Sequence, residues 1–263
     1  MDLGLRDRVA IVGGASQGIG RATAQLLAAE GCRVVMAART EATLAAAAAA
    51  IAREAGAGAA LPVVCDMGSR GDIERLVART VSEFGRIDVL VNNAGGPPLG
   101  SFEAHDDDAW RRAFDTSLMS VVWMVRKALA WLKRSDRARV INITSTSVRE
   151  PIDGLILSNS IRLGTTGLAK TLSRELGPHG ITVNNVGPGT TMTARIRPLI
   201  EAQAKAEGRA FDEVRDERAR RIPVRRIGEP EDVAAMIVFL ASAQARQVSG
   251  QTILVDGGAT AAV

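Results

Sequence analysis

Three glycines that follow a short apolar run give the first indication of chemistry in this sequence. The run at residues 9–12 is Val-Ala-Ile-Val, and Gly14, Gly18 and Gly20 come after it, before a helical pattern at residues 19–30. A strand, a glycine turn and a helix direct free backbone N–H groups and the positive end of a helix dipole at one point, which suits a phosphate. Glycine is needed because a side chain would hold a pyrophosphate away from the backbone. The residues expected to touch the nucleotide are Gly14, Ser16, Gln17, Gly18, Ile19 and Gly20.

The residue after the next apolar run, at residues 33–38, indicates which nucleotide is bound. An NAD site usually carries an acid there, which accepts hydrogen bonds from the adenosine ribose. This sequence has Ala38 followed by Arg39, so no carboxylate is present to repel a 2′-phosphate. A guanidinium can pair with that phosphate in a forked geometry. We therefore expect NADP(H) to be favoured over NAD(H).

Strand-like and helical segments alternate along the whole chain and must position these residues. The expected strands are residues 9–12, 33–38, 61–65, 87–91, 139–143, 181–186 and 252–255, and the expected helices are residues 19–30, 41–55, 70–84, 107–133 and 158–176. This alternation predicts an α/β fold, a doubly wound parallel sheet of about seven strands with helices on both faces. Ligands bind beyond the carboxyl ends of such strands, where the glycine turn and Arg39 fall. No linker composition interrupts the pattern, so we expect one domain over residues 1–263.

Composition excludes several classes of protein. Apolar residues make up 46% of the chain, but no stretch approaches the roughly 18 apolar residues of a membrane span. The first residues lack the apolar centre of a signal peptide, and Cys32 and Cys65 fall in segments expected to be buried, without metal-ligand spacing. We expect a cytoplasmic protein with core thiols, no membrane partner and no metal site.

The net charge of +4 is a local feature. Residues 195–226 contain ten Lys or Arg and six Asp or Glu, so this segment alone accounts for the whole excess. A nucleic-acid-binding domain spreads basic residues over a face or along a stripe. Nucleic acid is therefore not an expected partner, and a small-molecule substrate is.

Further motifs follow later strands in a fixed order. Asn92-Asn93-Ala94-Gly95 follows the strand at 87–91, Pro188-Gly189 follows the strand at 181–186, and Val255-Asp256-Gly257-Gly258 lies near the end. With the glycine turn, these motifs resemble the short-chain dehydrogenase/reductase family, and in particular 3-oxoacyl-(acyl-carrier-protein) reductase-like members. The resemblance runs from about residue 8 to residue 258. It implies a Rossmann fold and a homodimer or homotetramer assembled through the helices at 107–133 and 158–176.

The resemblance also implies further cofactor contacts. Asp66 would hydrogen-bond the adenine amino group with Met67 beside it, and Asn93, Ala94 and Gly95 would line the adenine ribose. The stretch that anchors the nicotinamide carboxamide corresponds to Pro188, Gly189, Thr191 and Thr193. Another common phosphate-binding position of the family, just before the second glycine, holds neutral Gln17.

Four catalytic positions of the family can be located in the same way. The family carries Asn, Ser, Tyr and Lys, with the Ser thirteen residues before the Tyr and the Lys four residues after it. Counting back from the helix that contains Lys170 places Arg162 at the Lys position and Ser158 at the Tyr position. Ser145 stands thirteen residues before Ser158, and Ser117 falls at the Asn position. Arg162 is then also the residue expected at the nicotinamide ribose.

The catalytic set Ser117, Ser145, Ser158 and Arg162 is atypical, because the sequence contains no tyrosine at all. A phenol has a pKa of about 10, which a neighbouring positive charge lowers further, so it can exchange a proton near neutral pH. The hydroxyl of Ser158 is far less acidic and lies closer to its own backbone. Arg162 can supply charge but cannot relay a proton, since guanidinium stays protonated. Ser145 can still hydrogen-bond a carbonyl, and Ser117 could hold a water molecule.

Other ionisable groups offer few alternatives. Asp153 is expected in a solvated loop, although burial would let it donate a proton, and His105 and His179 are expected at the surface. Residues 192–227 resemble the family's substrate lid. Their arginines form either a solvated helix face or a surface that attracts an anionic substrate. They are Arg218, Arg220, Arg221, Arg225 and Arg226.

Three functions are compatible with these residues. The first is an NADP(H)-dependent oxidoreductase that transfers hydride between nicotinamide and a ketone or alcohol. The second is a non-catalytic, nucleotide-sensing relative, since the general acid is lost while the nucleotide motifs remain. The third is non-redox lyase chemistry on the same scaffold, as in halohydrin dehalogenases. Those enzymes keep the Tyr and lose the nucleotide glycines, the reverse of this sequence, so the third is the least favoured.

Overall fold

A computed structural model describes residues 2–262 and contains a seven-stranded parallel sheet. The strand order is β3-β2-β1-β4-β5-β6-β7. The strands are β1 (Val9–Gly13), β2 (Arg33–Ala38), β3 (Ala60–Val64), β4 (Val89–Asn92), β5 (Arg139–Ile143), β6 (Thr182–Pro188) and β7 (Thr252–Val255). The predicted doubly wound parallel sheet is therefore confirmed.

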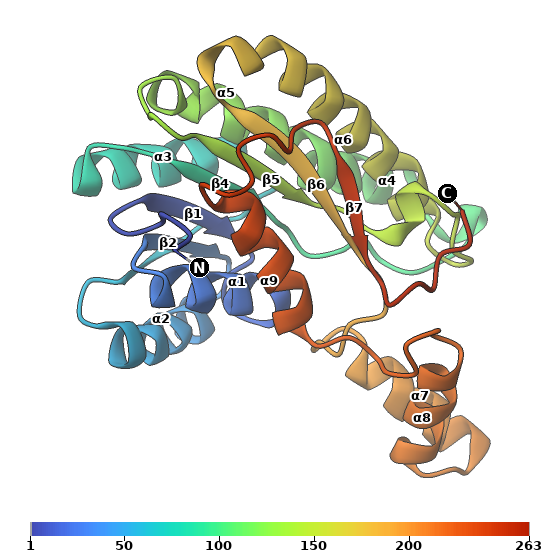
Figure 1. Ribbon diagram of the computed structural model, residues 1–263. Coiled ribbons are helices and arrows are strands. Elements are labelled where there is room, and N and C mark those ends of the chain that lie inside the picture. The colour runs from blue at the N-terminus through green and yellow to red at the C-terminus, as the bar shows by residue number, and fades with distance from the viewer. Residues whose placement is uncertain (1, 263) are drawn as a thin grey trace.

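Helices cover both faces of the sheet. Figure 1 shows α1 (Gly18–Ala29), α2 (Glu41–Ala55) and α9 (Pro230–Ala241) on one face, and α3 (Arg70–Phe84), α5 (Ser120–Leu132) and α6 (Ile156–Glu175) on the other. α4 (Asp107–Phe114) leads toward α5, and α7 (Arg197–Glu207) and α8 (Phe211–Arg220) project away from the sheet. Short 3₁₀ turns lie at Phe102–Ala104, Thr146–Val148 and Gly177–His179. Among the helices of residues 2–262, none has the length and apolarity needed to cross a membrane.

The two faces of the sheet belong to two separate cores. On β2, Val34 and Met36 pack into the core under α1, α2 and α9, whereas Val35 and Ala37 pack into the core under α3 and α5. Side chains alternate between the faces of a strand, so a strand buried on both sides must be apolar throughout. This requirement explains the nearly continuous apolar runs in the sequence.

Both cysteines are buried beside strands rather than inside them. Cys32 precedes β2 and donates a hydrogen bond from Sγ to the carbonyl of Leu5 at 3.3 Å, and Cys65 follows β3. Burial, followed by nearby carboxylates, raises the pKa of each thiol to about 12. They are core thiols, and the described residues include no cluster of three His, Cys, Asp or Glu side chains able to hold a metal.

A row of three buried amides and one threonine hydroxyl crosses four neighbouring strands. Asn92, Asn142, Asn185 and Thr252 occupy matching positions in the register of β4, β5, β6 and β7. Each Nδ2 donates to the next residue in the row, at 2.8 Å from Asn92 to Asn142, 2.9 Å from Asn142 to Asn185, and 3.1 Å from Asn185 to Thr252. The row therefore runs in one direction across half of the sheet.

The long helix predicted at residues 107–133 is confirmed over residues 107–132, but its hydrogen-bond pattern changes in the middle. A π-helical turn at Asp115–Met119 separates α4 from α5, and the N–H of Ser120 reaches the carbonyl of Asp115 five residues earlier. Thr165 on α6 donates its hydroxyl to the carbonyl of Ser117 at 2.9 Å. Such a turn inserts one residue into a helix, and it redirects the side chains there.

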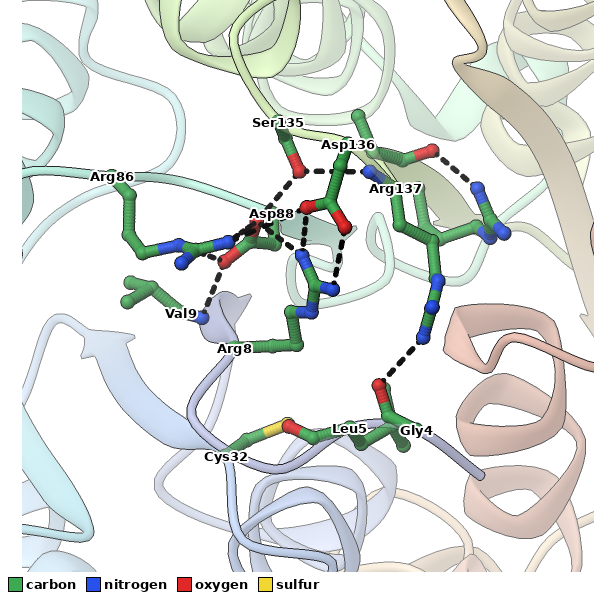
Figure 2. Close-up of polar contacts among 12 residues, drawn as sticks. Gly4, Leu5, Arg8, Val9, Cys32, Arg86, Asp88, Ser135, Asp136 and Arg137 are labelled. Atoms are coloured by element: carbon green, nitrogen blue, oxygen red, sulfur yellow. Dashed lines mark hydrogen bonds and ion pairs between the residues drawn. The ribbon is translucent and has the colours of Figure 1, made fainter. Parts of the chain in front are cut away.

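A buried carboxylate joins the amino ends of three strands. Asp88, just before β4, is fully buried, and its Oδ2 accepts hydrogen bonds from the Val9 N–H at 2.9 Å and from Arg86 Nε at 2.8 Å. Its Oδ1 accepts from Arg86 Nη2 at 2.7 Å and from Ser135 Oγ at 2.6 Å (Figure 2). Burial alone would raise the pKa of Asp88, but these donors stabilise the charged form, and its pKa is lowered.

The main chain of the same residue completes the junction. The Asp88 N–H donates to the carbonyl of Val9 at 2.9 Å, and the Arg139 N–H donates to the carbonyl of Asp88 at 2.8 Å. Arg8 Nη1 lies 3.4 Å from Asp88 Oδ1 and also pairs with Asp136 (Figure 2). One residue thereby fixes β1, β4 and β5 relative to one another.

We expect Asp88→Asn to lower the free energy of unfolding by about 3 kcal/mol, because it removes the charge at a fully buried site and directs an amide NH₂ at groups that are themselves donors. Urea unfolding at pH 7 measures the difference. The matched control is Asp107→Asn, whose side chain is 90% exposed and should change stability by less than about 1 kcal/mol.

The effect of Asp88→Asn should also depend on pH. The pKa of Asp88 is lower in the folded protein than in the unfolded chain. Its carboxylate therefore contributes fully to the free energy of unfolding above the unfolded-state pKa of about 3.9, and this contribution is lost as the pH falls through the lower folded-state pKa. The wild-type advantage should therefore shrink below about pH 4. Equal unfolding midpoints for the two proteins at pH 7 would contradict the proposed role of this carboxylate.

Candidate active site

A cleft lies at the carboxyl ends of the strands, where the strand order reverses between β1 and β4. Open α/β sheets bind ligands at such a reversal. The segments following β1, β2, β3 and β4 line the cleft, together with the segment that leads into α7. The predicted cofactor residues that line it are Gly14, Ser16, Gln17, Gly18, Ile19, Gly20, Arg39, Asp66, Met67, Asn93, Ala94, Gly95 and Thr193.

The glycine turn has the conformation and close contacts that require glycine. Gly14 and Gly18 have φ of 58° and 56°, in the left-handed region that L side chains rarely adopt. A Cβ on Gly14 would lie 2.7 Å from Asn93 Nδ2, and a Cβ on Gly20 would collide with the carbonyl oxygen of Gly14. Asn93 Nδ2 also donates to the carbonyl of Gly13 at 3.0 Å, so the segment after β4 holds the turn in place.

The amino end of α1 is open toward this cleft. α1 begins at Gly18, the side chain of Gln17 makes no capping hydrogen bond, and the first turn contains no acid. The first N–H groups of a helix have no partner within the helix and carry partial positive charge. This turn therefore provides a cradle of backbone donors that fits a pyrophosphate.

The other end of the cleft carries the residues expected at the adenosine. Arg39 is exposed and lines the cleft, next to the hydroxyl-bearing Thr40 and Thr43. Asp66 Oδ1 accepts a hydrogen bond from the Gly68 N–H at 2.9 Å, and Asp66 Oδ2 makes no hydrogen bond to residues 2–262. The arrangement offers a guanidinium and hydroxyls at the end of β2, and an acceptor at the end of β3.

Only one of the four residues expected at the nicotinamide lines the cleft. That residue is Thr193, and a Cβ on Gly18 would lie 3.4 Å from its methyl carbon. Thr191 is buried and donates its hydroxyl to the carbonyl of Gly189 at 3.1 Å. Pro188 and Gly189 stand at the end of β6, outside the residues that line the cleft.

Two of the predicted catalytic serines, Ser145 and Ser158, lie beside Ser147 just after β5, and of these two only Ser145 is accessible. Ser145 is half-buried, and its Oγ accepts a hydrogen bond from the Ser147 N–H at 3.1 Å, which leaves its own O–H free to donate. Ser158 is buried, and its Oγ lies 3.2 Å from Oγ of Ser147, a residue that sequence reasoning missed. The hydroxyl that replaces the phenol is therefore paired with another hydroxyl inside the protein.

Arg162 lies one helical turn after Ser158 and is tied to the end of β5. Its Nη1 donates to the carbonyls of Ile143 at 2.7 Å and Thr144 at 2.8 Å, while its Nε is buried without a partner among residues 2–262. Desolvation by burial, followed by the positive charge of Arg195, lowers the pKa of Arg162 to about 10. It is still protonated at neutral pH and acts as a fixed cation.

Ser117 occupies the π-helical turn, facing α6. Its Oγ is buried and has no hydrogen-bond partner within the described residues, while its carbonyl accepts from Thr165. An unpaired buried hydroxyl can bind a water molecule or a ligand group where there is room for one. The structure places this predicted residue on a π-helical turn that the sequence did not reveal.

Arg195 is the other residue that the sequence analysis missed. It lines the cleft two residues after Thr193, and its Nη2 donates to the carbonyl of Pro97 at 2.6 Å, in the segment that follows β4. Sequence reasoning counted it only as part of a basic segment. Its position directly after the nicotinamide motif was the signal that could have identified it.

The remaining candidates stay outside the cleft. Asp153 and His179 are exposed, as expected. The prediction for His105 was wrong, because its Nε2 is buried against Gly100 without a hydrogen-bond partner within residues 2–262. In the basic segment, Arg221 pairs with Glu217 and Arg226 with Asp232, which fits a solvated surface.

Known proteins share both this sequence pattern and this fold. The profile of the family described as Enoyl-(Acyl carrier protein) reductase matches residues 14–260. The short-chain reductase protein NovJ of Streptomyces niveus is 38% identical over 253 residues, which cover 96% of this chain and 94% of NovJ.

Two solved structures superpose on nearly all of the chain. L-Sorbose reductase from Gluconobacter frateurii, complexed with NADPH and L-sorbose, has a TM-score of 0.96 and 28% identity, with 100% of both chains covered. An NADPH-bound short chain oxidoreductase from Pseudomonas aeruginosa PAO1 that contains an atypical catalytic center has a TM-score of 0.90 and 28% identity, with 98% of this chain and 100% of that chain covered. The chain belongs to the short-chain dehydrogenase/reductase family.

Proposed function

We propose that the protein is an NADP(H)-dependent oxidoreductase that interconverts a ketone and an alcohol with an atypical catalytic set. The observation that carries the proposal is the cleft at the β1–β4 reversal, where a glycine cradle and an open helix end adjoin Arg39. A core without ligand function does not need backbone donors left free at such a position. NADPH-bound relatives of the same fold support the same conclusion.

Different residues of the chain would bind different parts of the cofactor. The turn from Gly14 to Gly20 would hold the pyrophosphate, Arg39 would pair with the 2′-phosphate, and Asp66 would accept from the adenine amino group. Asn93, Ala94 and Gly95 would line the adenine ribose, and Thr193 would lie at the nicotinamide. Bound nicotinamide would supply or accept the hydride.

At the reacting carbon, Ser145 and Arg162 would act without a phenol. The free O–H of Ser145 can donate to a substrate carbonyl and polarise it. Arg162 would hold positive charge near the nicotinamide ribose, and its two bonds to β5 carbonyls fix its position. The proton would come from water, for which the unpaired Ser117 hydroxyl offers one hydrogen bond. Ser158 would contribute packing, since Ser147 occupies its hydroxyl.

A second function is favoured by one specific observation. The Ser158 hydroxyl is buried and paired, so no acidic side chain stands where the family places its proton donor. A protein that binds NADP(H) and senses it, without turnover, would have such a site. Reduction of any ketone by the purified protein would eliminate this alternative, because a sensor has no turnover. The intact glycine cradle argues against non-redox chemistry, which has no use for it.

Two further features support an assembled enzyme with a lid. An apolar groove between α4 and α6 is lined by Trp110, Phe114, Leu118 and Ile161, and Phe114 and Leu163 are exposed. Exposed apolar surface of this kind suits a contact with a second copy, so we propose a homodimer or a homotetramer. The projecting helices α7 and α8 would form the substrate lid.

Cofactor preference can be tested on binding alone. In titrations followed by nicotinamide fluorescence, the wild type should bind NADPH more tightly than NADH. Arg39→Ala should weaken NADPH binding by about tenfold or more and leave NADH unchanged, because only the 2′-phosphate loses a charge-assisted pair. The control is Arg33→Ala, an exposed arginine at the opposite end of β2, whose hydrogen bond reaches Gly58. Equal loss for both cofactors in Arg39→Ala would contradict the assignment.

The catalytic assignment predicts that restoring the phenol accelerates the reaction. The double variant Ser158→Tyr with Arg162→Lys should increase kcat for ketone reduction by roughly 10²-fold or more, since a positioned general acid contributes about that much. Circular dichroism and NADPH binding verify that the variant folds. A folded variant that binds NADPH and shows no gain would mean that proton transfer does not limit the rate.

A further inference from the structure

Arg195 is an exposed arginine that lines the cofactor cleft two residues after Thr193. Its guanidinium lies directly on the backbone of Gly96, because a Cβ at that glycine would collide with Nη1. Nη2 is bonded to the Pro97 carbonyl, and Nη1 makes no hydrogen bond within residues 2–262. The chain thus makes room for this guanidinium with a glycine and orients it with one carbonyl.

A second cation lies close to it. Arg162 and Arg195 are near enough for the charge of Arg195 to lower the pKa of Arg162, after the larger effect of burial. Neither forms an ion pair with any carboxylate of residues 2–262. Arg162 also has a buried Nε without a partner, and its Nη2 bonds to nothing in that part of the chain.

Arginines elsewhere in the same segment divide into two groups, since Arg218 and Arg225 bond to neutral oxygen atoms whereas others pair with carboxylates. On the projecting helices, Arg209, Arg215 and Arg221 each bond to one or two carboxylates of their own neighbourhood. Desolvation by burial penalises the charge of Arg162, which no carboxylate of the described residues balances, whereas Arg195 is exposed and lines the cleft. The free N–H donors of these two guanidinium groups therefore suit an anionic ligand.

We propose that Arg195, with Arg162 beside it, binds the carboxylate of the substrate, so that the enzyme acts on oxo acids and their hydroxy acids rather than on neutral ketones. The inference rests on the proposed function and names its substrate class. A guanidinium provides two parallel N–H donors that match the two carboxylate oxygens. The neighbouring cleft residues Pro97, Pro98, Leu99 and Leu199 are apolar and suit an aliphatic chain.

The test compares oxo acids with their methyl esters, which keep the carbonyl and the chain but lose the charge. The probes are 2-oxohexanoate, 3-oxohexanoate and 4-oxohexanoate with the three esters, titrated by calorimetry into the NADPH complex. At least one acid should bind about tenfold or more tightly than its ester, as a charge-assisted pair provides. Arg195→Gln should abolish that preference and leave the Kd for NADPH unchanged.

Two further variants separate the position of the guanidinium from its charge. Gly96→Ala keeps Arg195 but displaces its guanidinium, so this variant should also bind the oxo acid no more tightly than its ester. Arg215→Gln removes an equal charge from the surface of α8 and should keep it. If Arg195→Gln instead weakens NADPH binding and keeps the preference, Arg195 serves the pyrophosphate and the inference is wrong.

The remaining outcomes distinguish this inference from the proposed function. Equal binding of acid and ester, or no binding of any acid, would overturn the inference while NADPH binding and ketone turnover still stand. A wild-type protein that binds no NADPH would remove the proposed function. In that case, titration of the acids and esters into the protein without NADPH would still test whether Arg195 binds a carboxylate, because binding needs no turnover.

Discussion

The buried carboxylate of Asp88 is the constraint on which the geometry of the site depends. It lies at the amino ends of β1, β4 and β5, and it bonds to each of these strands or to the residue next to it. β1 and β4 are the paired strands between which the strand order reverses at the cleft. Because both strands are short, fixing their relative position at one end also fixes the separation of the glycine turn and the Asn93 segment at the other. The buried charge of Asp88 thus helps to align the strands from which the cleft-lining segments begin.

The chemistry of the site is limited by acidity. The residues near the end of β5 can donate hydrogen bonds and hold positive charge, but none of the side chains at the four predicted catalytic positions titrates near neutral pH. The proton of a carbonyl reduction must therefore come from water or from the substrate. An oxo acid is suited to this situation, because a bound carboxylate offsets the two guanidinium charges that would otherwise disfavour transfer of a proton to the site.

The fold followed from the sequence because its determinants are local. Apolar runs and glycine positions predicted the strands to within two residues, and the parallel arrangement followed from their alternation with helices. The glycine turn and Arg39 were also predictable, since their context is carried by neighbouring residues. The contacts of Ser147, Arg195 and Asn93 were not predictable, because each depends on segments that meet only in the folded chain. The π-helical turn was not predictable for the same reason, because its Ser117 carbonyl accepts a hydrogen bond from Thr165, which lies forty-eight residues further on.

The row of three amides and one hydroxyl from Asn92 to Thr252 has a consequence for folding. The strands β4, β5, β6 and β7 are similar apolar segments, and a parallel sheet forms by slow pairing of segments that are distant in sequence. Apolar contacts alone distinguish poorly between correct and shifted partners. A strand displaced by one residue would turn its amide to the opposite core, and a displacement by two would leave buried amides unsatisfied on both of its neighbours. Folding intermediates with a shifted strand register are therefore destabilised at several strand pairs at once. The register that remains favoured is the one that also brings Ser145 and Arg162 to the cleft end of the sheet.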